Sequence, residues 1–194
     1  MEKQRFYKIR RLVTASVLLA LGMVLPLLTA QIKEIGDSLL PMHLVVMLCG
    51  TLCGWRYALP VGAVLPPLRS LLFGMPPIYP NAVWMAAELS AYGFVIGVLF
   101  ARRRRFSRPY LLFCLGASMI AGRFVWGAVK AVLLGVAGKS FGLSAFLVGG
   151  FVDALPGIVL QLVLVPLITE LVLRRFGEQE SAMHDEPKNE GTVN

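Results

Sequence analysis

Five ionisable side chains fall inside stretches of the sequence that are otherwise apolar, and they are the residues best placed to do chemistry. They are Arg69, Glu88, Arg123, Lys130 and Asp153. A charge inside a membrane-spanning helix is costly, so it usually marks a substrate path or a binding site and has a partner of opposite charge. The alternative explanation for any one of them is neutralisation of charge between neighbouring helices.

Helical spacing brings aromatic and polar side chains beside these charges, because residues three, four or seven apart share one face of a helix. Two such stripes consist of Asn81, Trp84, Glu88 and Tyr92, and of Arg123, Trp126 and Lys130. Aromatic walls with a few polar anchors are typical of small-molecule pockets. We therefore expect both stripes, together with Asp153, Arg69 and His43, to bind a substrate. Three positive against two negative buried groups favour a substrate with an anionic group such as a carboxylate.

Motifs of several enzyme classes are missing from the sequence. The two histidines, His43 and His184, lie far apart and lack the ligand spacing of a metal site. Gly138-Lys139-Ser140 resembles the end of a phosphate-binding loop, but the position that requires glycine is Leu133. We therefore expect no enzyme activity, no metal and no cofactor. A membrane-embedded enzyme that uses Glu88 and Asp153 as a carboxylate pair is the weaker alternative.

The composition shows that these charged residues lie in a chain that is otherwise strongly apolar. Hydrophobic residues make up 57% of the 194-residue chain and charged residues only 15%, with a mean hydropathy of +0.71. Such a chain is an integral membrane protein, and spans of about 20 residues each leave no room for a large extramembrane catalytic domain.

The apolar stretches predict an all-α membrane protein with six transmembrane helices. The predicted spans are 12–30, 43–59, 60–73, 81–101, 110–137 and 144–173. A tight turn is predicted at Gly54-Trp55-Arg56-Tyr57, between the second and third apolar stretches. They form one membrane domain over residues 1–175, and the polar residues 176–194 are expected to be a disordered cytoplasmic tail.

The basic residues predict the orientation of the six spans. Of the 19 lysines and arginines, 14 fall on the side of the two termini, and only Lys33 and Lys139 fall on the opposite side. Cytoplasmic loops carry an excess of Lys and Arg, so both termini are expected in the cytoplasm. The net charge of +8 then reflects topology, and no nucleic-acid partner is expected.

Small residues four apart allow helices to approach closely. Ser16-x-x-x-Ala20 lies in the first predicted span, Gly50-x-x-x-Gly54 in the second and Gly93-x-x-x-Gly97 in the fourth. Internal packing is the ordinary explanation of such pairs, but the first span is otherwise plain and could also dock a partner.

Three stretches of sequence carry a resemblance to a known family. They are Pro41-Met42-His43-Leu44, Gly74-Met75-Pro76-Pro77 followed by Pro80, and Glu88-Leu89-Ser90-Ala91-Tyr92-Gly93. With the six-span layout and the basic N-terminus, the chain resembles a substrate-binding S component of an energy-coupling factor (ECF) transporter over about residues 8–175.

The resemblance implies a subunit of an ABC importer in the bacterial cell membrane. It would capture a vitamin or related micronutrient at its outer face, and associate with a transmembrane coupling protein and two cytoplasmic ATPases. Family members carry Ala-x-x-x-Ala in helix 1 for the coupling protein, and here Ser16 and Ala20 occupy that motif.

Several points stay open on sequence alone. A self-sufficient small transporter, proton-coupled through Glu88 or Asp153, and a mere assembly scaffold are alternatives to the S component. Pantothenate, a folate-like or pyridine-type vitamin, and a cobalamin or queuosine precursor all suit a mixed polar and aromatic pocket.

Overall fold

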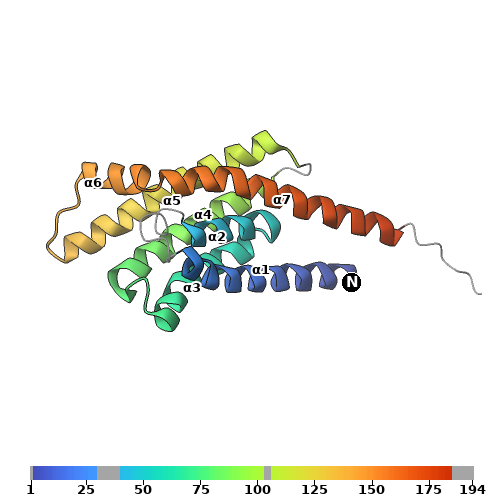
Figure 1. The fold of residues 1–194 in the computed structure, drawn as a ribbon, viewed down its shortest axis with the longest axis horizontal. Coiled ribbons are helices and arrows are strands. Elements are labelled where there is room, and N and C mark those ends of the chain that lie inside the picture. Colours follow the sequence, from blue (N-terminus) through green and yellow to red (C-terminus); the bar gives the residue numbers. More distant parts are fainter. Residues whose placement is uncertain (1, 30–39, 103–105, 185–194) are drawn as a thin grey trace, which may run out of the picture.

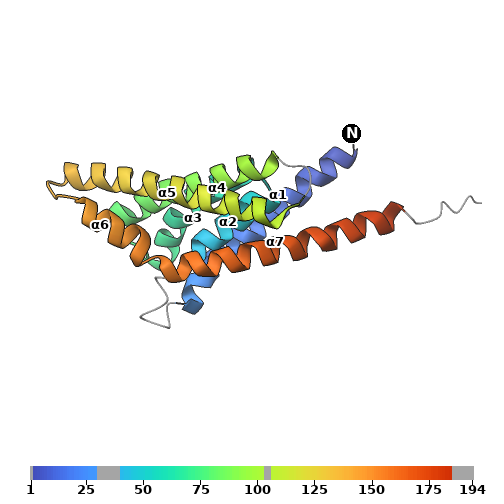
Figure 2. The same cartoon turned by 90° about the horizontal axis from the view of Figure 1, so that it is seen from above.

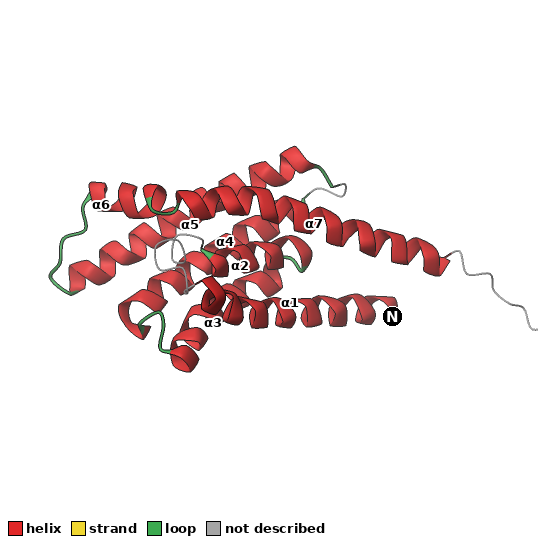
Figure 3. Ribbon diagram, viewed as in Figure 1, coloured by secondary structure: helices red, strands yellow, loops and turns green. Residues whose placement is uncertain are grey.

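The computed structural model describes residues 2–29, 40–102 and 106–184, and every regular element in these ranges is helical (Figures 1 and 3). The elements are α1 (Glu2–Thr29), α2 (Pro41–Leu52), α3 (Trp55–Phe73), η1 (Ile78–Ala82), α4 (Val83–Ala101), α5 (Arg108–Val136), α6 (Leu143–Leu147), η2 (Val148–Val152) and α7 (Leu155–His184). The prediction of an all-α chain is confirmed for the described residues.

Four helical segments are long and apolar enough to cross a bilayer. They are Arg5–Leu28, Ile78–Ala101, Arg108–Val136 and Leu155–Arg175. The second and third of the six predicted spans correspond to α2 and α3, which are not among them. At about 1.5 Å per residue, the 12 residues of α2 reach only about 18 Å, less than the roughly 30 Å of a hydrocarbon core. Six crossings therefore stay a prediction.

Helix α2 lies at the centre of the protein and contacts α1, α3, α4 and α7 (Figure 2). All residues from Met42 to Thr51 are buried. A helix that is apolar all round is expected to be covered by other helices. Its two ends are tied to α7, since Gln161 donates to the carbonyl of Leu40 over 3.4 Å and the Thr51 and Thr169 hydroxyls lie 3.1 Å apart.

The turn between α2 and α3 lies at the beginning of the tight turn that the sequence predicts at Gly54-Trp55-Arg56-Tyr57, although the predicted spans 43–59 and 60–73 put their boundary later. It falls at Cys53–Gly54, where Gly54 has a φ of 88° that favours glycine. The structure therefore has α2 ending at Leu52 and α3 beginning at Trp55, in place of a boundary between residues 59 and 60. Pro60 lies inside α3.

Helices α3 and α4 cross at glycines, so that their backbones are in close contact. A Cβ at Gly62 would lie 2.6 Å from the Leu89 backbone, and one at Gly93 would lie 2.7 Å from the Ala58 carbonyl oxygen. One at Gly97 would collide with the backbone of Trp55. The Gly93-x-x-x-Gly97 pair therefore serves internal packing.

The last predicted span is divided. Residues 144–173 contain α6, η2 and a turn at Asp153–Ala154 before α7 begins at Leu155. Gly149 and Gly150 weaken the helix, and Pro156 fits the first turn of α7, where its missing N–H breaks no intrahelical hydrogen bond.

Helix α7 extends beyond the predicted end of the last span. It continues to His184, so the expected disorder of 176–194 is wrong for residues 176–184. Its Glu, Gln, Ala and Met residues are good helix formers. Residues 185–194 lie outside the described part.

The start of α1 and the end of α7 point to the same end of the elongated molecule, and the connection from α5 to α6 lies at the opposite end (Figures 1 and 2). Near the first end, Glu170 of α7 pairs with Arg174 of the same helix and with Arg108 at the beginning of α5.

Candidate functional site

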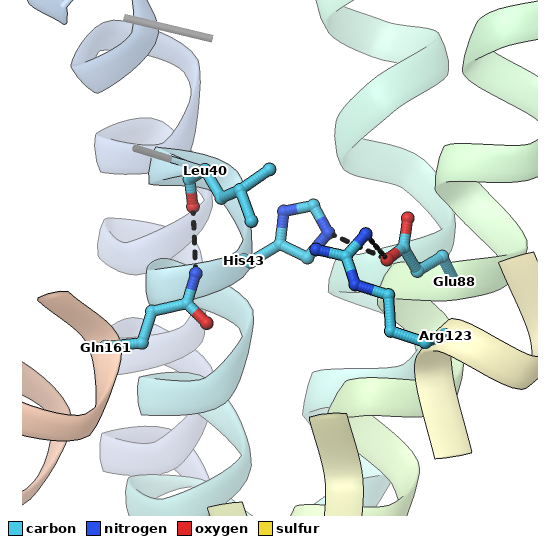
Figure 4. Close-up of polar contacts among 5 residues, drawn as sticks. All are labelled: Leu40, His43, Glu88, Arg123 and Gln161. Atoms are coloured by element: carbon cyan, nitrogen blue, oxygen red, sulfur yellow. Dashed lines mark hydrogen bonds and ion pairs between the residues drawn. The ribbon is translucent and has the colours of Figure 1, made fainter. Parts of the chain in front are cut away.

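Three ionisable side chains from three helices meet in the interior (Figure 4). Arg123 of α5 donates through Nη1 to Oε1 of Glu88 on α4 over 2.9 Å. His43 of α2 lies on the other side, with Nε2 3.3 Å from the same oxygen. All three side chains are 95% buried or more, so this ion pair is shielded from solvent. The sequence predicted these three residues for the site, and the structure brings them together.

Most hydrogen-bond donors of this cluster have no partner among the residues that the structure describes. Nε and Nη2 of Arg123 are buried and make no hydrogen bond within the described ranges, and neither ring nitrogen of His43 makes one of acceptable geometry. The 3.3 Å approach of His43 to Glu88 is therefore a short electrostatic contact only. A buried polar group without a hydrogen bond costs about 1–3 kcal/mol, and more when it is charged. Such a cluster is suited to a polar molecule that enters and accepts these bonds.

Tyr92 extends the polar cluster, and Gln161 lies near it in the chain of contacts. The Tyr92 ring packs edge-on against the His43 ring at a centroid distance of 5.2 Å and lies close to Gly122, and its side chain also interacts with Glu88. Gln161 is buried and donates to Leu40, three residues before His43 (Figure 4). Three helices, α2, α4 and α5, therefore contribute to the polar cluster, and α7 is joined through Gln161 to the backbone just before α2.

A second group of predicted residues forms an aromatic cage around a cation. The ammonium of Lys130 lies 4.4 Å from the ring centre of Trp126, 5.2 Å from that of Trp84 and 5.3 Å from that of Phe141. A cation within about 6 Å of an aromatic ring centre is attracted by the ring quadrupole. Among the described residues no ion pair of Lys130 with a carboxylate is seen, so the rings hold its charge.

The cage and the polar cluster are adjacent on α5. Arg123, Trp126 and Lys130 lie along one face of the helix, as their spacing predicted. Gly149 and Gly150 of η2 pack near the Trp126 ring, and Gly150 also lies near the side chain of Arg123. The two groups together form one polar and aromatic surface, which we call the α5 site: His43, Trp84, Glu88, Tyr92, Arg123, Trp126, Lys130 and Phe141.

The other predicted residues lie elsewhere. Arg69 is buried and donates to the carbonyl of Met75 over 3.0 Å, while its neighbour Ser70 donates to the carbonyl of Pro76. These bonds hold the proline-rich connection from α3 to α4. Asp153 is exposed at the end of η2 and Asn81 is half-buried in η1. Within the described ranges neither is joined to the α5 site by a hydrogen bond or an ion pair.

Two residues of this region were not predicted as site residues. Phe141 completes the cage, and Phe146 packs on Trp126 at 6.1 Å and occupies the space that a side chain at Gly127 would need. Gln161, whose spacing from Asp153 marks it as a polar position of the last predicted span, bonds to Leu40. Phe141 and Phe146 carry no usable signal, because aromatic residues are common throughout the chain.

The comparisons give one result that bears on the whole chain. The family model described as "ECF transporter, substrate-specific component" matches residues 10–169. No curated protein and no solved structure gives a significant match.

Proposed function

This chain belongs to the substrate-specific components of ECF transporters, and from that premise we propose that it captures a vitamin or related micronutrient at the α5 site. The observation that carries the proposal is the buried meeting of Glu88, Arg123 and His43 next to the aromatic cage of Lys130. A substrate-specific subunit needs a site that combines ring surfaces with a few fixed polar groups. The α5 site is the region of this protein that supplies both.

The way in which the helices share the α5 site supports the same function. Helices α4 and α5 provide most of the α5 site, and α2 contributes His43 from the centre. The proline-rich connection between α3 and α4, held by Arg69 and Ser70, is suited to cover the site as part of a lid. The predicted orientation puts this connection on the outer side of the membrane, where an importer meets its substrate.

Delivery of the substrate needs partners, which we propose are a transmembrane coupling protein and two cytoplasmic ATPases. Ser16 and Ala20 are both exposed on α1, and the Ser16 hydroxyl is bonded to the Leu12 carbonyl of its own helix. A small surface without free polar groups allows a second helix to approach closely. This face of α1 is therefore the proposed docking surface.

Mass spectrometry of the small molecules that leave the purified, denatured protein tests the capture function. We expect one vitamin-like compound in stoichiometric amount from the unaltered chain. Glu88→Ala and Lys130→Ala should each reduce the amount retained at least tenfold, because each removes a charged group of the α5 site. Ala131→Leu, an exposed position on α5, is the control and should retain the compound. Unchanged retention in both site variants contradicts the assignment of the α5 site.

A further inference from the structure

The guanidinium of Arg123 has two edges, and only one of them is used. Nη1 donates to Glu88, whereas Nε and Nη2 are buried and have no hydrogen-bond partner within the described ranges. Nε and Nη2 lie on the same side of the planar guanidinium, so their N–H groups point in parallel. This edge is the fork that binds the two oxygens of a carboxylate.

The ion pair with Glu88 fixes that fork in place. Arg123 has a 5% exposed side chain and Glu88 a 2% exposed one, so the pair is held in the interior and its direction is set by Nη1. A preorganised donor loses little conformational freedom when a ligand binds. The second edge is therefore available without any rearrangement of the ion pair.

The net charge of the α5 site determines which charge a bound substrate group should carry. Glu88 and Arg123 neutralise each other, and Lys130 adds one positive charge that the aromatic rings hold. One carboxylate, with a single negative charge, brings the total to zero. A phosphate would carry about −1.5 to −2 at neutral pH and would leave excess negative charge in a dry site.

We infer that the substrate is a carboxylic acid whose carboxylate accepts two parallel hydrogen bonds from Nε and Nη2 of Arg123. The inference rests on the proposed capture function and narrows its substrate class. Arg69 is not chosen as the anchor because it lies outside the α5 site, in the part of α3 that holds the connection to α4 through the carbonyl of Met75. The body of the substrate then lies along α5 toward Trp126 and the cage of Lys130, which favours an acid with a flat or apolar body.

The first test is made on the unaltered, full-length protein. The compound released on denaturation is identified by mass spectrometry, and we expect it to contain a carboxylate. Binding of two matched pairs, nicotinate against nicotinamide and pantothenate against pantothenol, is then measured by isothermal titration. In at least one pair the acid should bind at least tenfold more tightly than its neutral partner. A released compound without a carboxylate overturns the inference, and so does equal binding within both pairs.

The second test changes the fork and keeps the charge. Arg123→Lys can still pair with Glu88 but cannot donate two parallel bonds, so the preference for the acid should fall about 10- to 100-fold, as expected for charged hydrogen bonds. Arg56→Lys, an exposed position near the beginning of α3, is the control and should keep the preference. A purely structural role of Arg123 would instead weaken acid and neutral partner alike, which also overturns the inference.

The two proposals fail in different ways. If the protein releases no compound and binds no member of either pair, the capture function itself is wrong. If it captures a compound that lacks a carboxylate, or if Arg123→Lys keeps the preference for acids, the capture function stands and only the assignment of the anchor fails.

Discussion

The polar side chains at the centre of this protein differ in how many of their polar atoms are bonded to other residues of the chain. Glu88 is approached by both Arg123 and His43, while Arg123 uses one of its nitrogens on Glu88 and leaves two unbonded among the described residues. Lys130 is bound by ring faces alone within the described ranges. Strong fixed contacts therefore alternate with unused donors, which is the combination that a binding site needs.

The tryptophans provide a residue-scale prediction. The chain has three tryptophans, and two of them, Trp84 and Trp126, flank Lys130. The remaining one, Trp55, packs against Phe94 and Arg56 and is not part of the α5 site. Adding back the released compound to ligand-free protein should change the tryptophan fluorescence, because the substrate contacts the cage rings. We expect the change to persist in Trp55→Phe and to disappear in the double variant Trp84→Phe, Trp126→Phe.

The contrary result has a clear meaning. If the fluorescence change is lost in Trp55→Phe and kept in the double variant, then the substrate binds outside the cage. Equilibrium binding measured in parallel shows whether each variant still takes up the compound.

Also at the scale of residues, the sequence predicted the residues that form the α5 site better than it predicted which candidates lie outside it. Spacing along α4 and α5 was enough to bring Trp84, Glu88, Tyr92, Arg123, Trp126 and Lys130 to two helix faces. It could not show that Asp153 is exposed or that Arg69 bonds to Met75, because depth along a helix says nothing about the direction of a side chain. Phe141 was missed since its partner, Lys130, is in another element.

At the scale of elements, the crossing of α3 and α4 depends on glycine. A Cβ at Gly62 would lie 2.6 Å from the Leu89 carbonyl, a backbone atom that cannot rotate away. Gly62→Ala should therefore lower the stability by about 1–3 kcal/mol, as is usual for overpacking. Thermal unfolding of the purified protein in detergent measures the effect.

The matched control is a glycine with room around it. Gly116 of α5 has no heavy atom within 4 Å of the position that a Cβ would take. Gly116→Ala should leave the melting temperature unchanged or raise it, since alanine is the better helix former. A loss at Gly116 as large as that at Gly62 would show that close packing is not the cause.

The long apolar helices were predicted well from the length of their apolar stretches. The ends of the shorter helices were predicted less well, because they depend on glycine and proline positions. Four long apolar segments stand out in both the sequence and the structure. The α2–α3 turn was predicted close to Gly54, where it lies, but the predicted bounds 43–59 and 60–73 differ from those of the helices, and Pro60 lies inside α3. The break before α7 falls at Asp153–Ala154, between the apolar helical segment Leu143–Val152 and the longer segment Leu155–Arg175.

At the scale of the whole molecule, the exposed small face of α1 is the place where a partner is expected. Ala20→Leu adds bulk to this face and should reduce co-purification with the coupling protein at least tenfold, because the helices can no longer approach closely. Ala131→Leu makes the same change on an exposed part of α5 and should have no effect. The measurement is pull-down from a strain that expresses both proteins.

Substrate binding separates docking from misfolding in that experiment. Ala20→Leu should still bind the released compound with unchanged affinity. If substrate binding and co-purification are lost together, the substitution has disturbed the fold. If co-purification persists, α1 docks no coupling protein through this face.

The position of α2 has a consequence for biosynthesis. Chains are made from the N-terminus, but α2 is covered by α4 and α7 as well as by its neighbours α1 and α3, and its last hydrogen bonds reach Gln161 and Thr169. Until the ribosome has made α7, the centre of the protein lacks one of its walls, and a 12-residue helix is too short to rest in the bilayer alone. The packing around α2 is therefore complete only when α7 enters the membrane, so chains shortened before Gln161 would be released unfinished and open to quality-control proteolysis.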